Sequence, residues 1–259
     1  MLKRQIFSKT YIQSLIILTE ASIFRQHKNS FLGSVWGVVQ PFIHIMIISY
    51  VFSFLLHQPA ETLVTNLVAS VSLWNFIVNS SVSSTKSLFE RSDILKKVYI
   101  QKTLLPVTDT LVHLYTFVYS FIAMYSALII IYPSHFSLSV LFVPIVVLPA
   151  IISTIAVGIA FAYITPYIMD VPHIITVILN AVYWAVPIIY PYEMVPESKR
   201  WIFEINPLFH LIRPLQLLLS DKAFPDPIYM IKALVTTLIL CLISYLFVRK
   251  LSRNVIYYL

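Results

Sequence analysis

The sequence has very few charged residues. Of its 259 residues, 11% are charged and 59% are hydrophobic, whereas soluble domains are about 25% charged and about 45 to 50% apolar. This balance excludes an ordinary soluble domain. The 18 Lys and Arg residues fall in a few short segments beside long apolar runs, which is typical of membrane topology rather than of a basic groove. We therefore expect membrane lipids as partners, and no nucleic acid.

Cysteine and glycine are also scarce. A single cysteine, Cys241, excludes an intrachain disulfide and a cysteine metal cluster. None of the three glycines lies in a glycine-rich loop followed by lysine that would hold the phosphates of a nucleotide. The seven histidines lack the spacing and the neighbouring carboxylates of a metal site. We expect no catalytic residue, no metal and no cofactor in this chain, which is therefore not the ATPase of any transport system.

Long apolar stretches predict an all-α, polytopic membrane protein with about six transmembrane helices. A helix needs about 20 mostly apolar residues to cross a hydrocarbon core of about 30 Å. The clearest predicted spans are Phe31–Leu56, Val107–Tyr132, Leu138–Phe161 and Ile231–Val248, and the shorter or more polar ones are Leu63–Ser84 and Ile174–Ile189. We divide this single transmembrane domain into an interfacial segment (1–30), spans one to five (31–189), an external segment (190–228), and a last span with its tail (229–259).

The positions of the cations predict the orientation. Lys and Arg are concentrated in the amino-terminal segment, in the loop before the third span and in the tail, whereas the loops 57–62 and 133–137 contain none. With six spans the cation-rich segments share one side, so both termini are expected in the cytoplasm. The apolar centre of the first 26 residues, Leu15–Leu18, is too short for a secretory signal. The helical spacing of Phe7, Tyr11, Leu15 and Leu18 instead predicts an interfacial amphipathic helix, with a short solvated leader as the alternative.

Polar residues follow one face of the second span. Ser72, Asn75, Asn79 and Ser83 recur at intervals of three and four. Two interpretations remain open: hydrogen bonds between packed helices, or one wall of a hydrophilic passage. The other candidates for a passage are Tyr115 and Tyr119 on the third span, Asn180, Tyr183 and Trp184 on the fifth, and Trp201 beyond it. Flat rings with a polar edge suit sugars, although Tyr and Trp are also common in the interfacial belt.

The segment between the fifth and last spans contains several prolines. Pro191, Pro196, Pro207 and Pro214 prevent a straight span through this region. A re-entrant helical hairpin that enters the outer leaflet and returns accommodates them. A loop that lies on the external membrane surface is the alternative.

Two long stretches resemble a known family. Phe24 to Pro41, FRQHKNSFLGSVWGVVQP, and Asp170 to Gln216, DVPHIITVILNAVYWAVPIIYPYEMVPESKRWIFEINPLFHLIRPLQ, resemble the membrane subunits of ABC-2 type exporters that move lipid-linked polysaccharides such as O-antigen, capsule or teichoic acid. The resemblance extends from about Ile23 to the tail. It implies a permease subunit in the bacterial cell inner membrane that serves O-antigen export in lipopolysaccharide biosynthesis.

The resemblance also implies partners. We expect a homodimer around one pathway for a lipid-linked glycan, with two copies of a separate cytoplasmic P-loop ATPase that bind ATP and Mg. A coupling helix would lie within residues 87–105, and the contact residues with the ATPase would be Arg91, Asp93, Lys96 and Lys97, with Asp170 in a second loop. The alternatives are an ABC-2 exporter of a drug or other small molecule and, from another class, a membrane-embedded glycosyltransferase. The sequence lacks the Asp-x-Asp pair that would hold a metal and a nucleotide sugar in such an enzyme.

Overall fold

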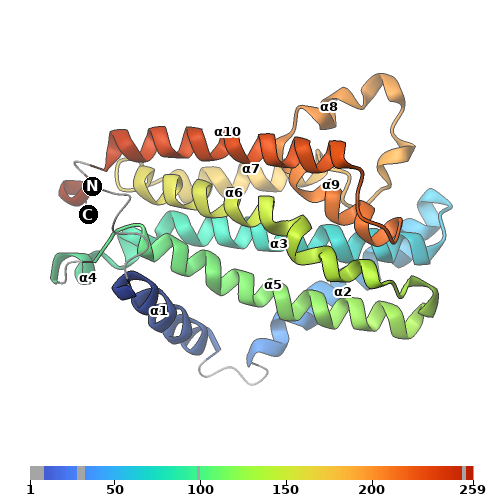
Figure 1. Cartoon of the computed structure of the whole chain (residues 1–259), viewed down its shortest axis with the longest axis horizontal. Helices are drawn as coiled ribbons and strands as arrows, with labels where there is room; N and C mark the ends of the chain where they lie inside the picture. Colours follow the sequence, from blue (N-terminus) through green and yellow to red (C-terminus); the bar gives the residue numbers. More distant parts are fainter. Residues whose placement is uncertain (1–8, 28–32, 98–99, 253–254, 259) are drawn as a thin grey trace.

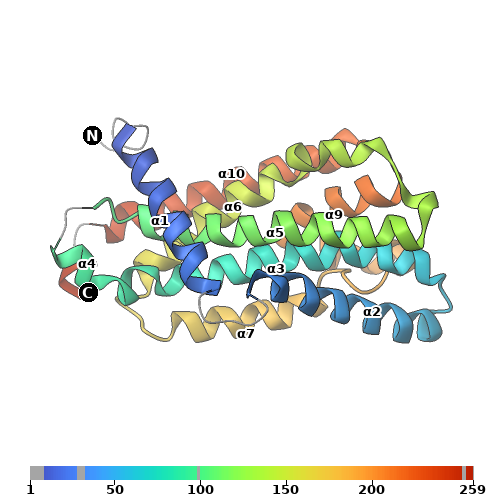
Figure 2. The same cartoon turned by 90° about the horizontal axis from the view of Figure 1, so that it is seen from below.

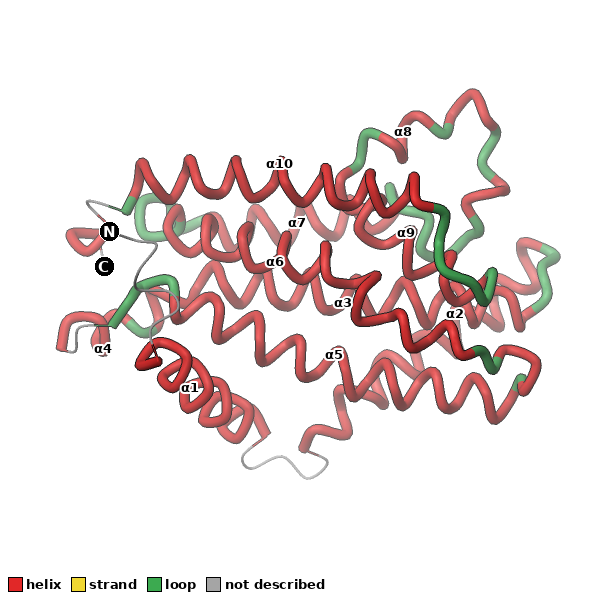
Figure 3. Tube along the Cα trace, in the orientation of Figure 1, coloured by secondary structure: helices red, strands yellow, loops and turns green. Residues whose placement is uncertain are grey.

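The structure is a bundle of long helices. The computed structural model describes residues 9–27, 33–97, 100–252 and 255–258, and every regular element within these ranges is helical (Figures 1 and 3). The five longest helices of the bundle run side by side (Figures 1 and 2). They are α2 (Trp36–Leu56), α3 (Ala60–Glu90), α5 (Leu104–Ile131), α6 (Val143–Ile164) and α10 (Pro227–Leu251). The predicted all-α polytopic membrane fold is confirmed.

Five helical segments in the described part of the chain are long and apolar enough to cross a membrane. They comprise α3, α5 and α10, together with α2 and α6 extended by the short turns η2 (Gly33–Val35) and η4 (Leu138–Phe142). The prediction of a full fifth span over Ile174–Ile189 was wrong in extent. Helix α7 (Val171–Trp184) has 14 residues, which is about 21 Å and shorter than the hydrocarbon core. It ends before Pro187, which has no N–H to donate and disfavours helical backbone at the preceding residue.

Helix α3 forms the centre of the bundle. It contacts α2, α5, α6, α7 and α9, and most of its residues are buried. Its 31 residues span about 46 Å, so it extends well beyond a hydrocarbon core of about 30 Å. The contact of α3 with α6 depends on Gly158, where an added Cβ would lie 2.8 Å from Ser84 Oγ. Small residues thus allow the close helix packing on which membrane bundles rely.

The predicted amino-terminal helix is present. Helix α1 (Lys9–His27) crosses one end of the bundle obliquely and packs against α5 (Figures 1 and 2). Its partly buried Leu18 packs on a small cluster with Leu88 and Leu105. Ile16 and Ile17 are 52% and 65% exposed, so the other side of α1 is apolar as well. An interfacial amphipathic helix has one apolar and one strongly polar face, so the helix was predicted correctly but its amphipathic character was not, and its interfacial position stays a prediction. Phe7 lies outside the described residues.

The segment between α7 and α10 has one long helical arm rather than two. Two single turns, η5 (Tyr192–Met194) and η6 (Glu197–Lys199), and the short α8 (Trp201–Glu204) precede α9 (Pro207–Ser220). The predicted hairpin therefore lacks a helical first arm, because Pro191 and Pro196 interrupt that part. Helix α9 begins beside Ile77 of α3 and ends near η4, where Ser139 Oγ donates to the Leu218 carbonyl at 3.4 Å. It packs against α3, α6 and α10 as a half-length helix.

One end of the bundle gathers three segments that are far apart in sequence. Helix α1, the short α4 (Ser92–Lys97) and the C-terminal end of α10 lie there (Figure 1). The tail is packed at this end, since Tyr167 donates its hydroxyl to the Leu251 carbonyl at 2.9 Å and Val255 is fully buried. The described parts of the cation-rich segments therefore share one end, as the charge pattern predicts.

Candidate functional site

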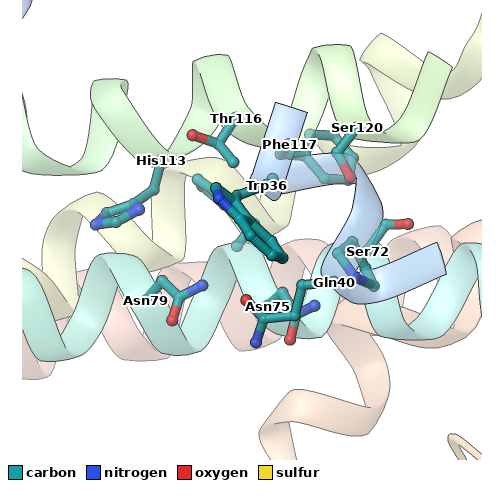
Figure 4. A pocket seen from close by; sticks show the side chains of 12 residues that line it. Trp36, Gln40, Ser72, Asn75, Asn79, His113, Thr116, Phe117 and Ser120 are labelled. Atoms are coloured by element: carbon teal, nitrogen blue, oxygen red, sulfur yellow. The ribbon is translucent and has the colours of Figure 1, made fainter. Parts of the chain in front are cut away.

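A polar cavity lies between α2, α3 and α5. Its volume is about 160 Å³, and Figure 4 shows its lining side chains. Helix α3 contributes Ser72, Asn75, Phe76 and Asn79, helix α2 contributes Trp36, Gly37, Gln40 and Pro41, and helix α5 contributes His113, Thr116, Phe117 and Ser120. Three of the four residues of the predicted polar stripe are therefore together in one cavity. Ser83, the fourth, is half-buried on α3 but does not line it.

The two asparagines of the stripe are available to a ligand. Asn75 is half-buried and Asn79 is exposed, and within the described residues neither side-chain amide donates to or accepts from another helix. Ser72, by contrast, donates to the Val68 carbonyl of its own helix. Within the part of the chain that the structure describes, hydrogen bonds between helices therefore do not account for Asn75 and Asn79. The interpretation as a wall of a polar passage is the one that the placement of Asn75 and Asn79 favours.

Trp36 supplies the aromatic surface of the cavity. Its ring is 52% exposed and lies between the α5 wall and the amides of Gln40 and Asn75 (Figure 4). None of the 12 lining residues is Asp, Glu, Lys or Arg. An indole face, amide donors and acceptors, and hydroxyls together suit a neutral ligand that has both C–H faces and hydroxyl groups.

A glycine and a tyrosine fix the start of α2. A Cβ on Gly37 would lie 2.0 Å from the Tyr119 hydroxyl, so with a larger residue at this position either the Tyr119 side chain or α2 would have to move. That hydroxyl donates to the Ser34 carbonyl at 3.0 Å. Tyr119 thus supports the backbone that positions Trp36, while Tyr115 packs edge-on against Tyr119 with ring centroids 5.2 Å apart. Neither tyrosine lines the cavity.

The remaining predicted pathway residues lie elsewhere. Tyr183 packs edge-on against Trp74 of α3 and against Trp184, with ring centroids 5.5 Å apart in each pair. Trp184 and Trp201 are 66% and 61% exposed, and Asn180 is exposed on α7. The structure does not bring these four residues to the polar cavity.

Sequence reasoning missed the α2 and α5 walls, although a signal was present. His113, Thr116 and Ser120 follow one another at intervals of three and four, which is the spacing of Ser72, Asn75 and Asn79. Trp36 and Gln40 are one helical turn apart. A search for matching polar stripes on neighbouring spans would have found both walls.

The predicted coupling residues lie at the end of the bundle that also holds the tail. Asp93, Lys96 and Lys97 are exposed on α4. Arg91, which was also predicted as an ATPase contact, donates from Nη2 to Asp109 Oδ1 of α5 at 2.6 Å, and the Asp109 side chain is only 6% exposed. Its main contact is thus inside the chain, because the buried carboxylate needs a cation.

The two predicted coupling loops are neighbours. A groove of about 270 Å³ is lined by Lys86, Phe89 and Glu90 at the end of α3 and by Thr165, Met169, Pro172 and His173 around the start of α7. Asp170 is exposed directly before α7. Segments some 80 residues apart in the chain therefore form one surface at this end of the bundle.

Comparison with known proteins places this architecture in a class of transporters. The family described as ABC-2 type transporter matches residues 13–219, and the chain belongs to that family. Among curated proteins it is similar to the O-antigen export system permease protein RfbA of Klebsiella pneumoniae, with 23% identity over 199 residues, 76% of each chain. It is also similar to the protein of the same name from Myxococcus xanthus, with 24% identity over 214 residues, 82% of each chain.

Proposed function

We propose that this chain is the channel-forming permease subunit of an ATP-driven exporter, and that a lipid-linked polysaccharide moves past the cavity between α2, α3 and α5. The observation that carries the proposal is the cavity without acidic or basic side chains that combines the exposed Trp36 with the amides of Asn75 and Asn79, which have no hydrogen-bond partner on another helix among the described residues. Family membership supports transport, and the names of the similar permeases support an O-antigen-like glycan.

The cavity chemistry suits passage rather than tight binding. A sugar ring stacks on Trp36 through its C–H face while its hydroxyls exchange hydrogen bonds among Gln40, Asn75 and Asn79. Each contact is made by an uncharged group, so successive sugars replace one another at little cost. Conduction requires binding that is favourable enough to enter and weak enough to leave.

The ATPase would be a separate cytoplasmic subunit, present in two copies beneath a homodimer of this chain in the bacterial inner membrane. It would dock on the surface formed by α4 and the turn at Asp170, with both termini on the same cytoplasmic side. Closure of the ATPase pair would change the conformation of the membrane subunits if the open and closed ATPase pairs bind two conformations of those subunits with different affinity.

The Arg91–Asp109 pair provides a route from α4 to the cavity. Arg91 directly precedes α4, and Asp109 lies on α5 one helical turn before His113 of the cavity wall. A displacement of α4 by the ATPase would therefore move the α5 wall. Asp93, Lys96, Lys97 and Asp170 are the proposed contacts with the ATPase, whereas Arg91 acts inside the chain.

Cysteine accessibility tests the passage. In a Cys241→Ser background, Asn75→Cys, Asn79→Cys and Thr116→Cys should react with a small membrane-impermeant thiol reagent, and labelling should fall when a glycan is trapped during export. Ile122→Cys, at a position further inside α5 that is 59% exposed and does not line the cavity, is the control. Cavity cysteines that react no faster than this control, in assembled complexes, contradict the proposal. Reactive cysteines that the glycan does not protect would indicate a small-molecule exporter instead.

A further inference from the structure

A second groove lies on another part of the bundle, between α10 and the corner that joins α8 to α9. Its volume is about 540 Å³, which lies within the range of roughly 300 to 1,000 Å³ that is typical of ligand pockets. One wall is a stripe of α10 that includes Val235, Ile239 and Ile243. The other wall comes from residues 204–210 and includes Pro207. The cavity proposed for the glycan shares none of these residues.

The groove is charged at one end only. Glu204 Oε2 lies 3.3 Å from Lys232 Nζ, and the two side chains are 47% and 36% exposed. Lys232 is the sixth residue of α10, about 8 Å from the start of the helix. The ion pair therefore lies near the membrane surface on the side away from the packed tail. From Lys232 to Ile243 the groove follows α10 for about 16 Å toward the middle of the bilayer.

The apolar part continues into the bundle. A pocket of about 170 Å³ shares Pro207 and Leu240 with the groove and extends between α6 and α7, where Val157 and Leu179 line it. Pro207 and Leu240 thus lie between the groove and a second, almost wholly apolar pocket.

We propose that the groove binds a zwitterionic membrane phospholipid, with an ethanolamine headgroup at Glu204 and Lys232 and an acyl chain along α10. The ammonium of such a headgroup pairs with the Glu204 carboxylate and its phosphate with the Lys232 ammonium. An anionic lipid has no cation for Glu204. An acyl chain is also much narrower than a helix of a second copy, which is about 10 Å wide.

Photo-labelling tests this site without any transport step. The full-length chain, purified with its associated subunits, is mixed with a phosphatidylethanolamine that carries a diazirine in one acyl chain. Labelled peptides should contain residues 204–210 and 231–243. Unlabelled phosphatidylethanolamine should compete, and phosphatidylglycerol should need a roughly tenfold higher concentration, the change expected from one lost charge-assisted hydrogen bond. Equal competition by the two lipids overturns the headgroup assignment.

Two tryptophan variants provide a matched pair. Val235→Trp fills the groove, and Leu238→Trp adds the same ring at a position that is 70% exposed and lines neither pocket. At subsaturating lipid, labelling of Val235→Trp should fall about tenfold, as expected for the loss of about two buried methylene groups, and labelling of Leu238→Trp should be unchanged. Val235→Phe replaces the first variant if that variant does not fold.

The results that overturn the proposal are specific. One is labelling of Val235→Trp at the level of the parent, or an equal fall in Leu238→Trp. The other is a disulfide between two copies of Val235→Cys in the Cys241→Ser background, together with no lipid label in the groove, which would make a second copy the occupant. Neither result depends on glycan export, so the lipid site and the proposed function fail separately.

Discussion

At the scale of single residues, the cavity depends most on Trp36. Its indole is the exposed ring of a cavity whose other lining groups are amides, hydroxyls, an imidazole, buried phenyl rings, a glycine and a proline. Its position depends in turn on Gly37, which leaves room for the Tyr119 hydroxyl. One small residue and one hydrogen bond therefore place the surface on which a sugar would stack.

Replacing the Trp36 ring should slow export. Stacking on an aromatic ring contributes about 0.5 to 1.5 kcal/mol beyond area burial, so Trp36→Ala should reduce the export rate about threefold to tenfold, and Trp36→Phe should retain most of it. The measurement is glycan reaching the cell surface per assembled complex. Phe54→Ala is the control, because Phe54 is on the same helix and 78% exposed. An equal loss in both variants would contradict the role of Trp36.

The Arg91–Asp109 pair should connect α4 to the cavity wall. Arg91→Ala leaves the Asp109 carboxylate buried and unpaired, which costs about 3 kcal/mol. We expect a lower thermal unfolding temperature and less export per ATP hydrolysed, with partial recovery in Arg91→Asp combined with Asp109→Arg. Asp93→Ala, exposed on α4, should not change the unfolding temperature. An Arg91→Ala complex with the parent's unfolding temperature and the parent's export per ATP hydrolysed would exclude the Arg91–Asp109 pair as the connection between α4 and the cavity wall.

The sequence predicts residues along one helix better than pairs between helices. Ser72, Asn75 and Asn79 were found because helical spacing alone puts them on one face. The partner of Arg91 was missed, since Asp109 is 18 residues away and the two meet only when α3, which Arg91 follows directly, packs beside α5. Trp36 was missed for a related reason: nothing in its own segment shows which neighbouring helix it faces.

At the scale of elements, the irregular segment 185–189 is the part that most needs explanation. Non-helical backbone is tolerated at membrane depth only where the protein satisfies its polar groups. Gln216 of α9 donates to the Pro187 carbonyl at 2.8 Å, and Asn66 of α3 donates to the Ile188 carbonyl at 3.0 Å. The chain between α7 and α8 is therefore held by side chains from two other helices.

The sequence indicates this segment only in part. Its prolines predict that no straight helix crosses here, and Asn206 and Pro207 mark the start of α9, where the Asn206 side chain accepts from the Leu208 N–H at 3.0 Å. The predicted span over Ile174–Ile189 counted apolar residues, and residues 186–189 are indeed buried. They are buried by protein contacts, which hydropathy does not distinguish from burial in lipid.

An ion pair fixes the external loop that follows. Arg213 of α9 is 7% exposed and its Nη2 donates to Glu193. Burial raises the pKa of the Glu193 carboxyl, but a hydrogen bond within the residue and the charge of Arg213 outweigh burial and hold the pKa below its ordinary value of 4.5. Such a group stabilises the fold above its unfolded-state pKa, and the stabilisation is lost as the pH falls through the lower folded-state pKa.

Acid should therefore release the loop. As the pH falls below 4.5, the ordinary pKa of Glu193, proteolysis within residues 190–200 should accelerate in the parent chain, assayed with an acid-active protease. Glu193→Gln should be cleaved faster already at neutral pH and should show a smaller further increase in acid. Glu197→Gln, at a side chain that is 90% exposed, is the control. An identical acid onset in the parent and Glu193→Gln would rule out this ion pair as the cause.

At the scale of the whole molecule, the proposed ATPase surface, the polar cavity and the external loop lie in different parts of the bundle. The surface proposed for the ATPase lies at the end with α1, α4 and the packed tail (Figure 1), and the cavity lies within the bundle. The loop that the Arg213–Glu193 ion pair holds precedes α9. The charged end of the lipid groove is formed by Glu204, just before α9, and Lys232, near the start of α10. Of this arrangement, charge pattern and hydropathy predict the common end of the cation-rich segments and the loop at the other end, because both follow membrane depth.

Charge reversal on α4 should weaken attachment of the ATPase. Lys97→Glu should lower the amount of ATPase that co-purifies at low salt, and the difference from the parent should become smaller as the salt concentration rises, because exposed charges are then screened. Insertion in the membrane should be normal. Lys199→Glu reverses an exposed lysine of η6 in the external loop and serves as the control. Unchanged co-purification over a range of salt concentrations would remove Lys97 from the docking surface.

The most direct test of the glycan pathway is capture of the glycan inside the cavity. A benzophenone amino acid is placed at position 36 or 40 in the cavity, or at position 54 on the exposed side of α2, in cells that make the polysaccharide. Irradiation during export should join glycan to the chain from positions 36 and 40 but not from position 54, and the adduct should disappear when glycan synthesis is blocked. Assembled, exporting complexes that give no more adduct from the cavity than from position 54 would contradict the account.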